Sequence, residues 1–289
     1  MSIRARLDAA LSRFRLGIRP TDVVLDVGSG NNPHPRADLL CDQFIFDDAE
    51  RGGQIIADRP VVGGDLERLP FGDQRLDFVI ASHVLEHVLD PAKAIAELKR
   101  VAPRGYIETP AEFGGKLLDM PFHRWFVRQE DRTLVFTGKP EPMYDPYLND
   151  VAYALWRDGK QLQRLYWDRL DLFLVRYVWD ATLEVRVIAP PGGLFSAFEA
   201  VHGGLEGLEV VKAPERLTPG MRAKALLRRY YQSGLYGPPR DLAFTKLCAC
   251  PACHGQLEFA ATTATCTGCR LAYPIEQGIP LLLASRVLA

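Results

Sequence analysis

The chain has 289 residues, 47% of them hydrophobic, which is enough to bury one large core or a core together with a small module. Its 35 Lys and Arg residues against 36 Asp and Glu residues give a formal charge of -1, which excludes a global basic field for nucleic acid or for an acidic membrane surface. The arginine-rich N-terminus lacks the apolar core of a secretory signal, and no apolar run is long enough to span a bilayer. We therefore expect a cytoplasmic protein of two domains.

The first predicted elements are a helix and a buried strand. Residues 3–16 carry apolar side chains at helical spacing, and Val23–Val27 is β-branched or aliphatic at nearly every position. Such a run is typical of a strand that is buried on both faces of a parallel sheet. Gly28 and Gly30 follow it and allow a sharp turn beside a ligand, at the place where open α/β sheets bind nucleotides.

Further strands alternate with helices along the chain. A helix is expected to begin at Pro91, with Asp90 as its N-cap. The alternation indicates an α/β fold with a doubly wound, mostly parallel sheet. The further strands are expected at 38–42, 60–66, 76–82, 105–109 and 183–188.

The connection after the glycine turn is unusual. Residues 31–37 contain Pro33 and Pro35, and prolines exclude a helix of ordinary length there. Pro33 also occupies the third glycine position of the dinucleotide fingerprint, which disfavours a nicotinamide dehydrogenase. We expect this loop to take another shape.

Three segments, 24–30, 64–71 and 76–88, follow one another in an order that resembles the class I S-adenosylmethionine-dependent methyltransferases, in particular the type 11 group. The resemblance implies a cofactor site at the ends of the strands. Asp42 would accept hydrogen bonds from the ribose hydroxyls and Asp65 from the adenine amine, because a carboxylate offers only acceptors. The other implied cofactor residues lie in the glycine turn or follow later strands; they are Asp26, Gly28, Ser29, Gly30, Leu66, Ser82 and His83.

A hydroxyl or amine that accepts a methyl group needs a base to take its proton. His123 is the first candidate, since histidine suits this task near neutral pH, and Glu108 is the second. A structural role for His123 is the alternative. Residues 83–87 also spell H-x-x-E-H, the signature of inverted zinc proteases when it lies on a helix. Here the motif follows a buried strand and no third ligand is evident, so we favour core packing or a role at the cofactor site.

The strongest local signal is a cysteine cluster near the C-terminus. Two C-x-x-C pairs separated by twelve residues can present four thiolates to one zinc ion, which leaves no open position for catalysis and indicates a structural site. Zinc would contribute on the order of 10 kcal/mol to folding. The expected ligands are Cys250, Cys253, Cys266 and Cys269.

Residues 246–284 around these cysteines resemble the zinc-ribbon activator subunits of methyltransferases. In that family the partners act on tRNA, ribosomal RNA and release factors, and the ribbon adds a strand to their sheet. The resemblance implies a contact between the ribbon and the catalytic domain near 279–283. We expect a methyltransferase domain at 1–236, with an aromatic-rich insert at about 111–180, and the ribbon at 237–289.

Together these patterns predict a methyltransferase that uses S-adenosylmethionine and carries structural zinc. The acceptor stays open among RNA, protein, sugars and other small molecules. The alternative is a non-catalytic protein in which a cofactor-like fold and a ribbon serve assembly or RNA docking.

Overall fold

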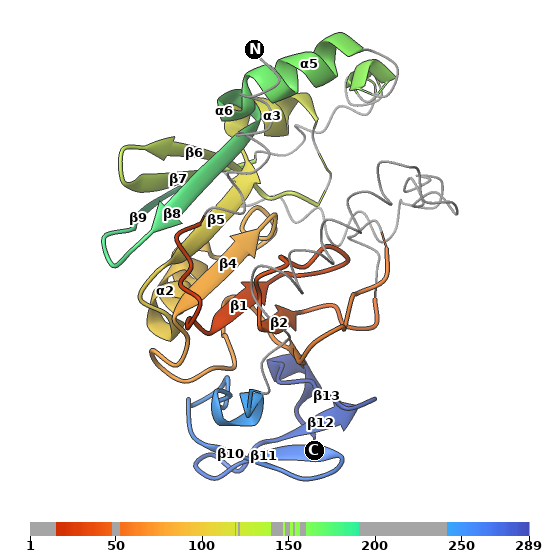
Figure 1. Cartoon of the computed structure of the whole chain (residues 1–289), viewed down its shortest axis with the longest axis vertical. Coiled ribbons are helices and arrows are strands. Elements are labelled where there is room, and N and C mark those ends of the chain that lie inside the picture. The colour runs from red at the N-terminus through yellow and green to blue at the C-terminus, as the bar shows by residue number, and fades with distance from the viewer. Residues whose placement is uncertain are drawn as a thin grey trace. The chain divides into compact units, whose positions relative to one another are not determined.

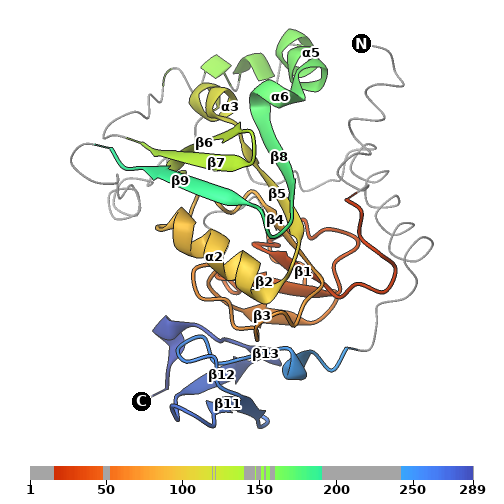
Figure 2. The ribbon, with the colours of Figure 1, turned by 90° about the vertical axis from the view of Figure 1, so that its left-hand side faces the viewer.

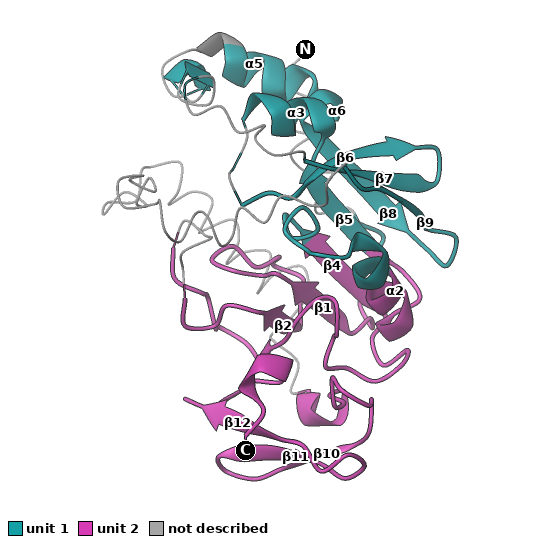
Figure 3. Cartoon of the chain, turned by 180° about the vertical axis from the view of Figure 1, so that it is seen from behind, with its two compact units in different colours: residues 1–18, 82–95, 106–207 teal, residues 19–81, 96–105, 208–289 magenta. Residues whose placement is uncertain are grey.

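The computed structural model describes residues 16–47, 53–118, 120, 122–139, 147, 151–152, 154–156, 160–190 and 242–288. The expected helix at 3–16 and the predicted boundary at 236 lie outside this part of the chain, apart from Leu16. The chain divides into two compact units (Figure 3). The first unit comprises 1–18, 82–95 and 106–207, and the second comprises 19–81, 96–105 and 208–289.

The second unit contains the parallel strands that the sequence predicts: β1 (Val24–Val27), β2 (Leu39–Asp42), β3 (Val61–Gly63) and β4 (Phe78–Ser82), whose last residue begins the first unit. They lie in the order β3-β2-β1-β4, and every described pairing among them is parallel. Figure 1 labels β1, β2 and β4 of this set. Nearly all of their residues are buried, as expected for strands covered on both faces. The parallel-dominated sheet confirms the predicted fold class.

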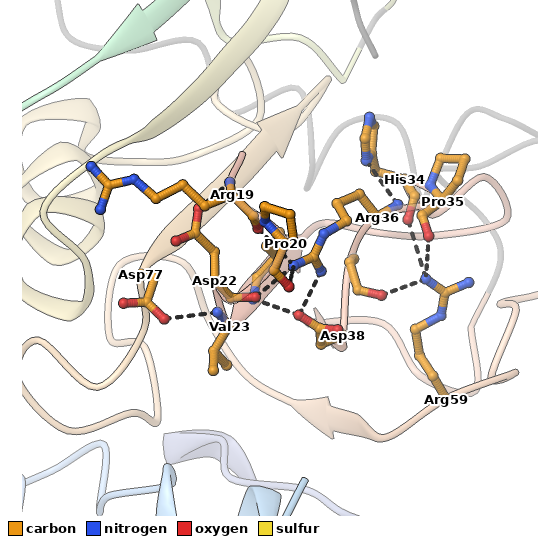
Figure 4. A network of polar contacts seen from close by, with 12 residues as sticks. Arg19, Pro20, Asp22, Val23, His34, Pro35, Arg36, Asp38, Arg59 and Asp77 are labelled. Carbon is orange, nitrogen blue, oxygen red and sulfur yellow. Dashed lines mark hydrogen bonds and ion pairs between the residues drawn. The ribbon is translucent and has the colours of Figure 1, made fainter. Parts of the chain in front are cut away.

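The connection from β1 to β2 contains turns and no helix, as the two prolines predict. Two arginines, Arg36 and Arg59, form hydrogen bonds that hold this connection in place (Figure 4). The buried guanidinium of Arg36 donates to Asp38 Oδ2 at 2.7 Å and to the carbonyl oxygen of Asp22 at 2.6 Å, and Arg59 donates to the carbonyl oxygen of Ala37 at 2.6 Å. These side chains satisfy carbonyl groups that a helix would have paired with its own amides.

Helix α2 (Pro91–Val101) begins as predicted. Asp90 Oδ1 accepts the Lys93 N–H at 3.0 Å, which is the bond of an N-cap. Ala94 and Leu98 are fully buried on its inner face.

In the first unit, Ser82 and His83 continue from β4 beside β5, where the His83 N–H donates to the Glu108 carbonyl at 2.7 Å. β8 lies beside β5 in this unit. A separate three-stranded sheet has the order β6-β7-β9. The elements of this unit are β5 (Gly105–Pro110), α3 (Glu112–Leu117), β6 (Trp125–Glu130), β7 (Thr133–Gly138), α5 (Lys160–Asp168), α6 (Leu170–Phe173), β8 (Leu174–Trp179) and β9 (Glu184–Ile188).

One strand prediction was wrong in its placement. Residues 184–188 do form a strand, but β9 pairs with β7 in the separate sheet and does not join the main one. The aromatic side chains of the predicted insert at about 111–180 differ in burial. Trp125 and Trp179 are buried in the core, whereas Tyr147 and Trp167 are exposed.

The C-terminal residues form a small antiparallel sheet in the order β10-β11-β12-β13. Its strands are β10 (Leu257–Phe259), β11 (Thr263–Cys266), β12 (Ala272–Glu276) and β13 (Ile279–Pro280), with short 3-10 helices at Phe244–Lys246 and Ala284–Arg286. β13 lies next to β3, the end strand of the parallel sheet (Figure 2).

The contact between this small sheet and β3 confirms the predicted one. The Leu282 N–H donates to the Gly63 carbonyl at 2.8 Å, and Leu281 pairs with Gly63 in parallel. Leu281 is 1% exposed and packs in a cluster with Ala37, Leu40, Ile45 and Val61. None of the helices in the described part of the chain is long and apolar enough to cross a membrane.

Candidate functional site

The glycine turn after β1 is held by the end of β2. Gly28 and Gly30 have φ angles of 67° and 47°, which suit glycine. Asp42 Oδ2 accepts the Gly30 N–H at 2.9 Å, and its Oδ1 accepts the Phe44 N–H at 2.9 Å. A carboxylate offers only acceptors, with about four lone-pair sites, which is the chemistry that a ligand hydroxyl requires.

Two further predicted residues line this turn. The carboxylate of Asp26 is buried, and its Oδ2 accepts the His34 N–H at 2.5 Å. This bond fixes the proline-containing loop to β1. The hydroxyl of Ser29 is buried and has no hydrogen-bond partner in the described part of the chain, so a ligand at the turn could satisfy it.

Asp65 and Leu66 follow β3, next to the end of β2. Asp42 lies opposite Gly63 in the parallel register, and Asp65 comes directly after Gly64. Asp65 Oδ1 accepts the Glu67 N–H at 2.9 Å. The second unit thus places Asp26, Asp42 and Asp65 in or just after three adjacent parallel strands, toward the edge where open α/β sheets bind ligands.

The first unit contains a cluster of acidic and imidazole groups at the end of β4. His83 has a φ of 55°, and its half-exposed ring lies with Nδ1 3.4 Å from Glu86 Oε1 and Nε2 3.6 Å from Glu108 Oε1. Glu108 is buried, and its Oε2 accepts the Tyr106 hydroxyl at 2.6 Å. The Ser82 hydroxyl lies 3.4 Å from Glu108 Oε1.

Charge in this cluster is shared between the carboxylates and His83. Burial opposes ionisation of both Glu86 and His83. For His83 the contact with Glu108, followed by that with Glu86, outweighs burial, and for Glu86 the contact with His83 does so. The pKa of Glu86 falls to about 2 and that of His83 rises to about 10. Burial, helped by the nearby His87, lowers the pKa of His123 well below its usual value. A neutral His123 is the protonation state that a general base requires.

The two predicted bases, Glu108 and His123, contact different residues. Glu108 contacts His83, whereas the His123 ring lies 4.8 Å from that of His87 in an edge-to-face arrangement. Glu86 and His87 are the neighbours that the sequence did not single out as site residues. The H-x-x-E-H motif at residues 83–87 is the sequence pattern from which they could have been identified.

The four predicted zinc ligands come together. Their sulfur atoms all lie within 4.8 Å of one another, with Cys250 Sγ 3.6 Å from Cys269 Sγ and Cys253 Sγ 3.4 Å from Cys266 Sγ. Tetrahedral zinc with bonds of about 2.3 Å holds sulfurs about 3.8 Å apart, so the donor set fits zinc. A Cβ at Gly255 would lie 3.1 Å from Cys266 Sγ and 3.2 Å from Cys253 Sγ, so glycine keeps the site open.

Two family models match the chain. Residues 43–108 match the one described as "Methyltransferase domain", and residues 241–278 match "Trm112p-like protein". The chain is 48% identical over 48 residues to a UPF0434 protein of Shewanella amazonensis, a match that covers 16% of this chain and 79% of that protein. The chain combines a methyltransferase domain with a Trm112p-like module. Through this module it belongs to the UPF0434 family.

The methyltransferase domain has its own relatives. It is 36% identical over 104 residues to the demethylmenaquinone methyltransferase of Renibacterium salmoninarum, which is 34% of this chain and 44% of that protein, less than half of its length. Among solved structures, a SAM-dependent methyltransferase from Aquifex aeolicus aligns with 54% of this chain and 81% of its own, at 20% identity and a TM-score of 0.30. A complex that contains the Haloferax volcanii Trm112 methyltransferase activator aligns with 37% of this chain and 57% of its own, at 20% identity and a TM-score of 0.27.

In the methyltransferase domain, sequence reasoning also missed Arg36 and Arg59. Both are buried or half-buried and hold the loop after β1. The two prolines indicate that this loop is not a helix, but no local pattern shows which side chains satisfy its carbonyl groups.

Proposed function

We propose that the chain transfers a methyl group from S-adenosylmethionine to an acceptor oxygen or nitrogen. The observation that carries this proposal is the placement of Asp26, Asp42 and Asp65 in or just after three adjacent parallel strands, with the glycine turn between the first two. The family of the matched domain supports the same cofactor.

The residues of the second unit suit the parts of this cofactor. The turn with positive φ at Gly28 and Gly30 would approach its methionine portion, and Ser29 offers it a hydroxyl that has no partner among the described residues. Asp42 would accept from the ribose hydroxyls. Asp65, with the Leu66 backbone, would hold the adenine. The predicted cofactor residues of the first unit are Ser82, the last residue of β4, and His83.

The cofactor supplies a methyl group that is already activated for transfer. The protein then has to position the acceptor in line with that group and accept its proton. We assign the proton to His123, whose pKa is lowered, with Glu108 as the second candidate. The four cysteines would hold one structural zinc ion in the Trm112p-like module, and the module would support the methyltransferase domain through its contact with Gly63.

Calorimetry with S-adenosylmethionine tests the proposal. Asp42→Asn and Asp65→Ala are expected to weaken binding at least tenfold, because each removes a charged acceptor for a ligand hydrogen bond worth about 1.5–3 kcal/mol. Glu258→Gln, an exposed carboxylate on β10, is the matched control and should bind like the unaltered protein. Undiminished binding by Asp42→Asn and Asp65→Ala together would contradict the assignment, as would no binding by the unaltered chain.

Turnover is tested separately with methyl-labelled cofactor. Fractionated RNA, protein and small-molecule pools are incubated with the chain, and the pool that gains label identifies the acceptor class. The non-catalytic alternative predicts cofactor binding without transfer of label to any pool.

A further inference from the structure

Three hydrogen bonds join the turn after β4 to the start of β6. The Arg124 N–H donates to the Glu86 carbonyl at 2.7 Å, and its Nε donates to the His87 carbonyl at 3.1 Å. The Trp125 Nε1 donates to the Val88 carbonyl at 2.7 Å. Because His123 directly precedes Arg124, these bonds bring its ring against His87, which is 36 positions away in sequence.

Three ligating groups converge at this point. Glu86, His87 and His123 each offer one donor atom, and the three atoms lie within 4.8 Å of one another. Glu86 Oε1 is buried without a hydrogen-bond partner in the described part of the chain, and His87 Nε2 lies 4.0 Å from it. Donors that share one zinc ion at about 2.0–2.2 Å lie about 3.4 Å apart in tetrahedral geometry, so side-chain rotations that close the present separations by about 1 Å would complete the site.

We infer that Glu86, His87 and His123 bind a divalent first-row transition metal ion, at a site separate from the four cysteines. With metal bound, His123 acts as a ligand, and the proton of the acceptor goes to Glu108, the second candidate base. Imidazole and carboxylate are ligands that suit zinc, iron, nickel and cobalt, and two histidines with one carboxylate leave coordination positions open. Two residues of the H-x-x-E-H motif, Glu86 and His87, belong to this site and His83 does not; His123 joins them from a distant segment.

Neighbouring residues hold these side chains in orientation, as the hydrogen-bond partners of metal ligands commonly do. Thr109 Oγ1 donates to Glu86 Oε2 at 2.9 Å, which leaves Oε1 toward the imidazoles. Phe122 stacks on His87 with ring centroids 5.4 Å apart and planes 15° apart. His83 Nδ1, 3.4 Å from Glu86 Oε1, competes for that oxygen, so we expect weaker binding here than at the cysteines.

The test uses the full chain with its cysteine site filled with zinc and unbound metal removed. Titration with Co²⁺ alone is expected to fill a second site, measured by calorimetry and by elemental analysis after desalting. His87→Ala and His123→Ala should lose this second equivalent and keep the first. His254→Ala, an exposed histidine of the Trm112p-like module, should keep both.

Spectroscopy of the unaltered chain tests the ligands without any substitution. The second Co²⁺ ion should show visible absorption without the charge-transfer bands that thiolate ligands produce. Thiolate bands from the second ion, no second equivalent at all, or full retention of it by both histidine variants would each overturn the inference. It does not rest on methyl transfer, because metal content and spectrum are read without the cofactor.

Discussion

The contact between the Trm112p-like module and β3 can be tested at Leu281. This side chain is 1% exposed and packs with Leu40, Ile45 and Val61. Leu281→Ala removes three carbon atoms, which at about 0.8 kcal/mol each amounts to about 2.4 kcal/mol of lost burial. The cavity left behind adds to this loss, so we expect the free energy of unfolding to fall by about 3 kcal/mol.

The assay is denaturant unfolding of the zinc-saturated full chain. Leu288→Ala is the matched control, because Leu288 lies in the same module with 43% of its surface exposed, and we expect it to change stability by no more than about 0.5 kcal/mol. If Leu281→Ala cost no more than Leu288→Ala, the module would not be packed against β3 in solution.

A second substitution approaches the same contact from β3. A Cβ at Gly63 would lie 2.9 Å from Leu281 Cδ2 and 3.2 Å from Leu281 Cα. Gly63→Ala is therefore expected to destabilise the chain by about 1–3 kcal/mol through overpacking. Combined with Leu281→Ala, which removes Cδ2, it should cost less than the sum of the two single changes. Strict additivity would refute the direct contact.

Three further predictions concern the zinc site, the loop after β1 and helix α2. Cys253→Ser should lose the structural zinc in elemental analysis, whereas Cys41→Ser should keep it. Arg36→Met should lower the free energy of unfolding by about 3–5 kcal/mol, because it leaves the Asp38 carboxylate, whose side chain is 9% exposed, without its cation, whereas the half-exposed Arg286→Met should have little effect. Asp90→Ala should cost about 1 kcal/mol by removing the cap of α2, measured by denaturant unfolding.

Each of these predictions has a contrary result. Retained zinc in Cys253→Ser would show that the four cysteines do not bind it together. Equal effects of the two arginine substitutions would show that the Arg36 network does not hold the loop. If Asp90→Ala left the free energy of unfolding unchanged, another group would cap α2.

The sequence predicted the parallel strands and the start of α2 because their signals are local. Val24–Val27 is apolar at nearly every position, and Asp90 followed by proline marks a helix start. The strands β6 and β7 were missed because their alternation is incomplete, with Trp125, Phe126 and Val127 buried in succession. The placement of β9 depends on its pairing with β7, which is a long-range choice that no local pattern encodes.

The residues of the candidate site also divide into those that have a local sequence signal and those that depend on long-range contacts. Asp42 and Asp65 could be found because each follows a recognisable strand. The grouping of Glu86, His87 and His123 could not be found, since it depends on hydrogen bonds from Arg124 and Trp125 to the backbone of a distant turn. The residue types of a segment do not show which of its backbone carbonyls accept hydrogen bonds from distant side chains.

The bond from Leu282 to Gly63 also bears on how the chain behaves toward its own copies. β3 is the end strand of its sheet, and an uncovered end strand offers unpaired amides and carbonyls to any other extended chain. The C-terminal residues cover part of that edge, and four cysteines organise the fold that presents them. With zinc at the four cysteines as proposed, loss of the metal would uncover this edge and favour strand pairing between copies of the chain.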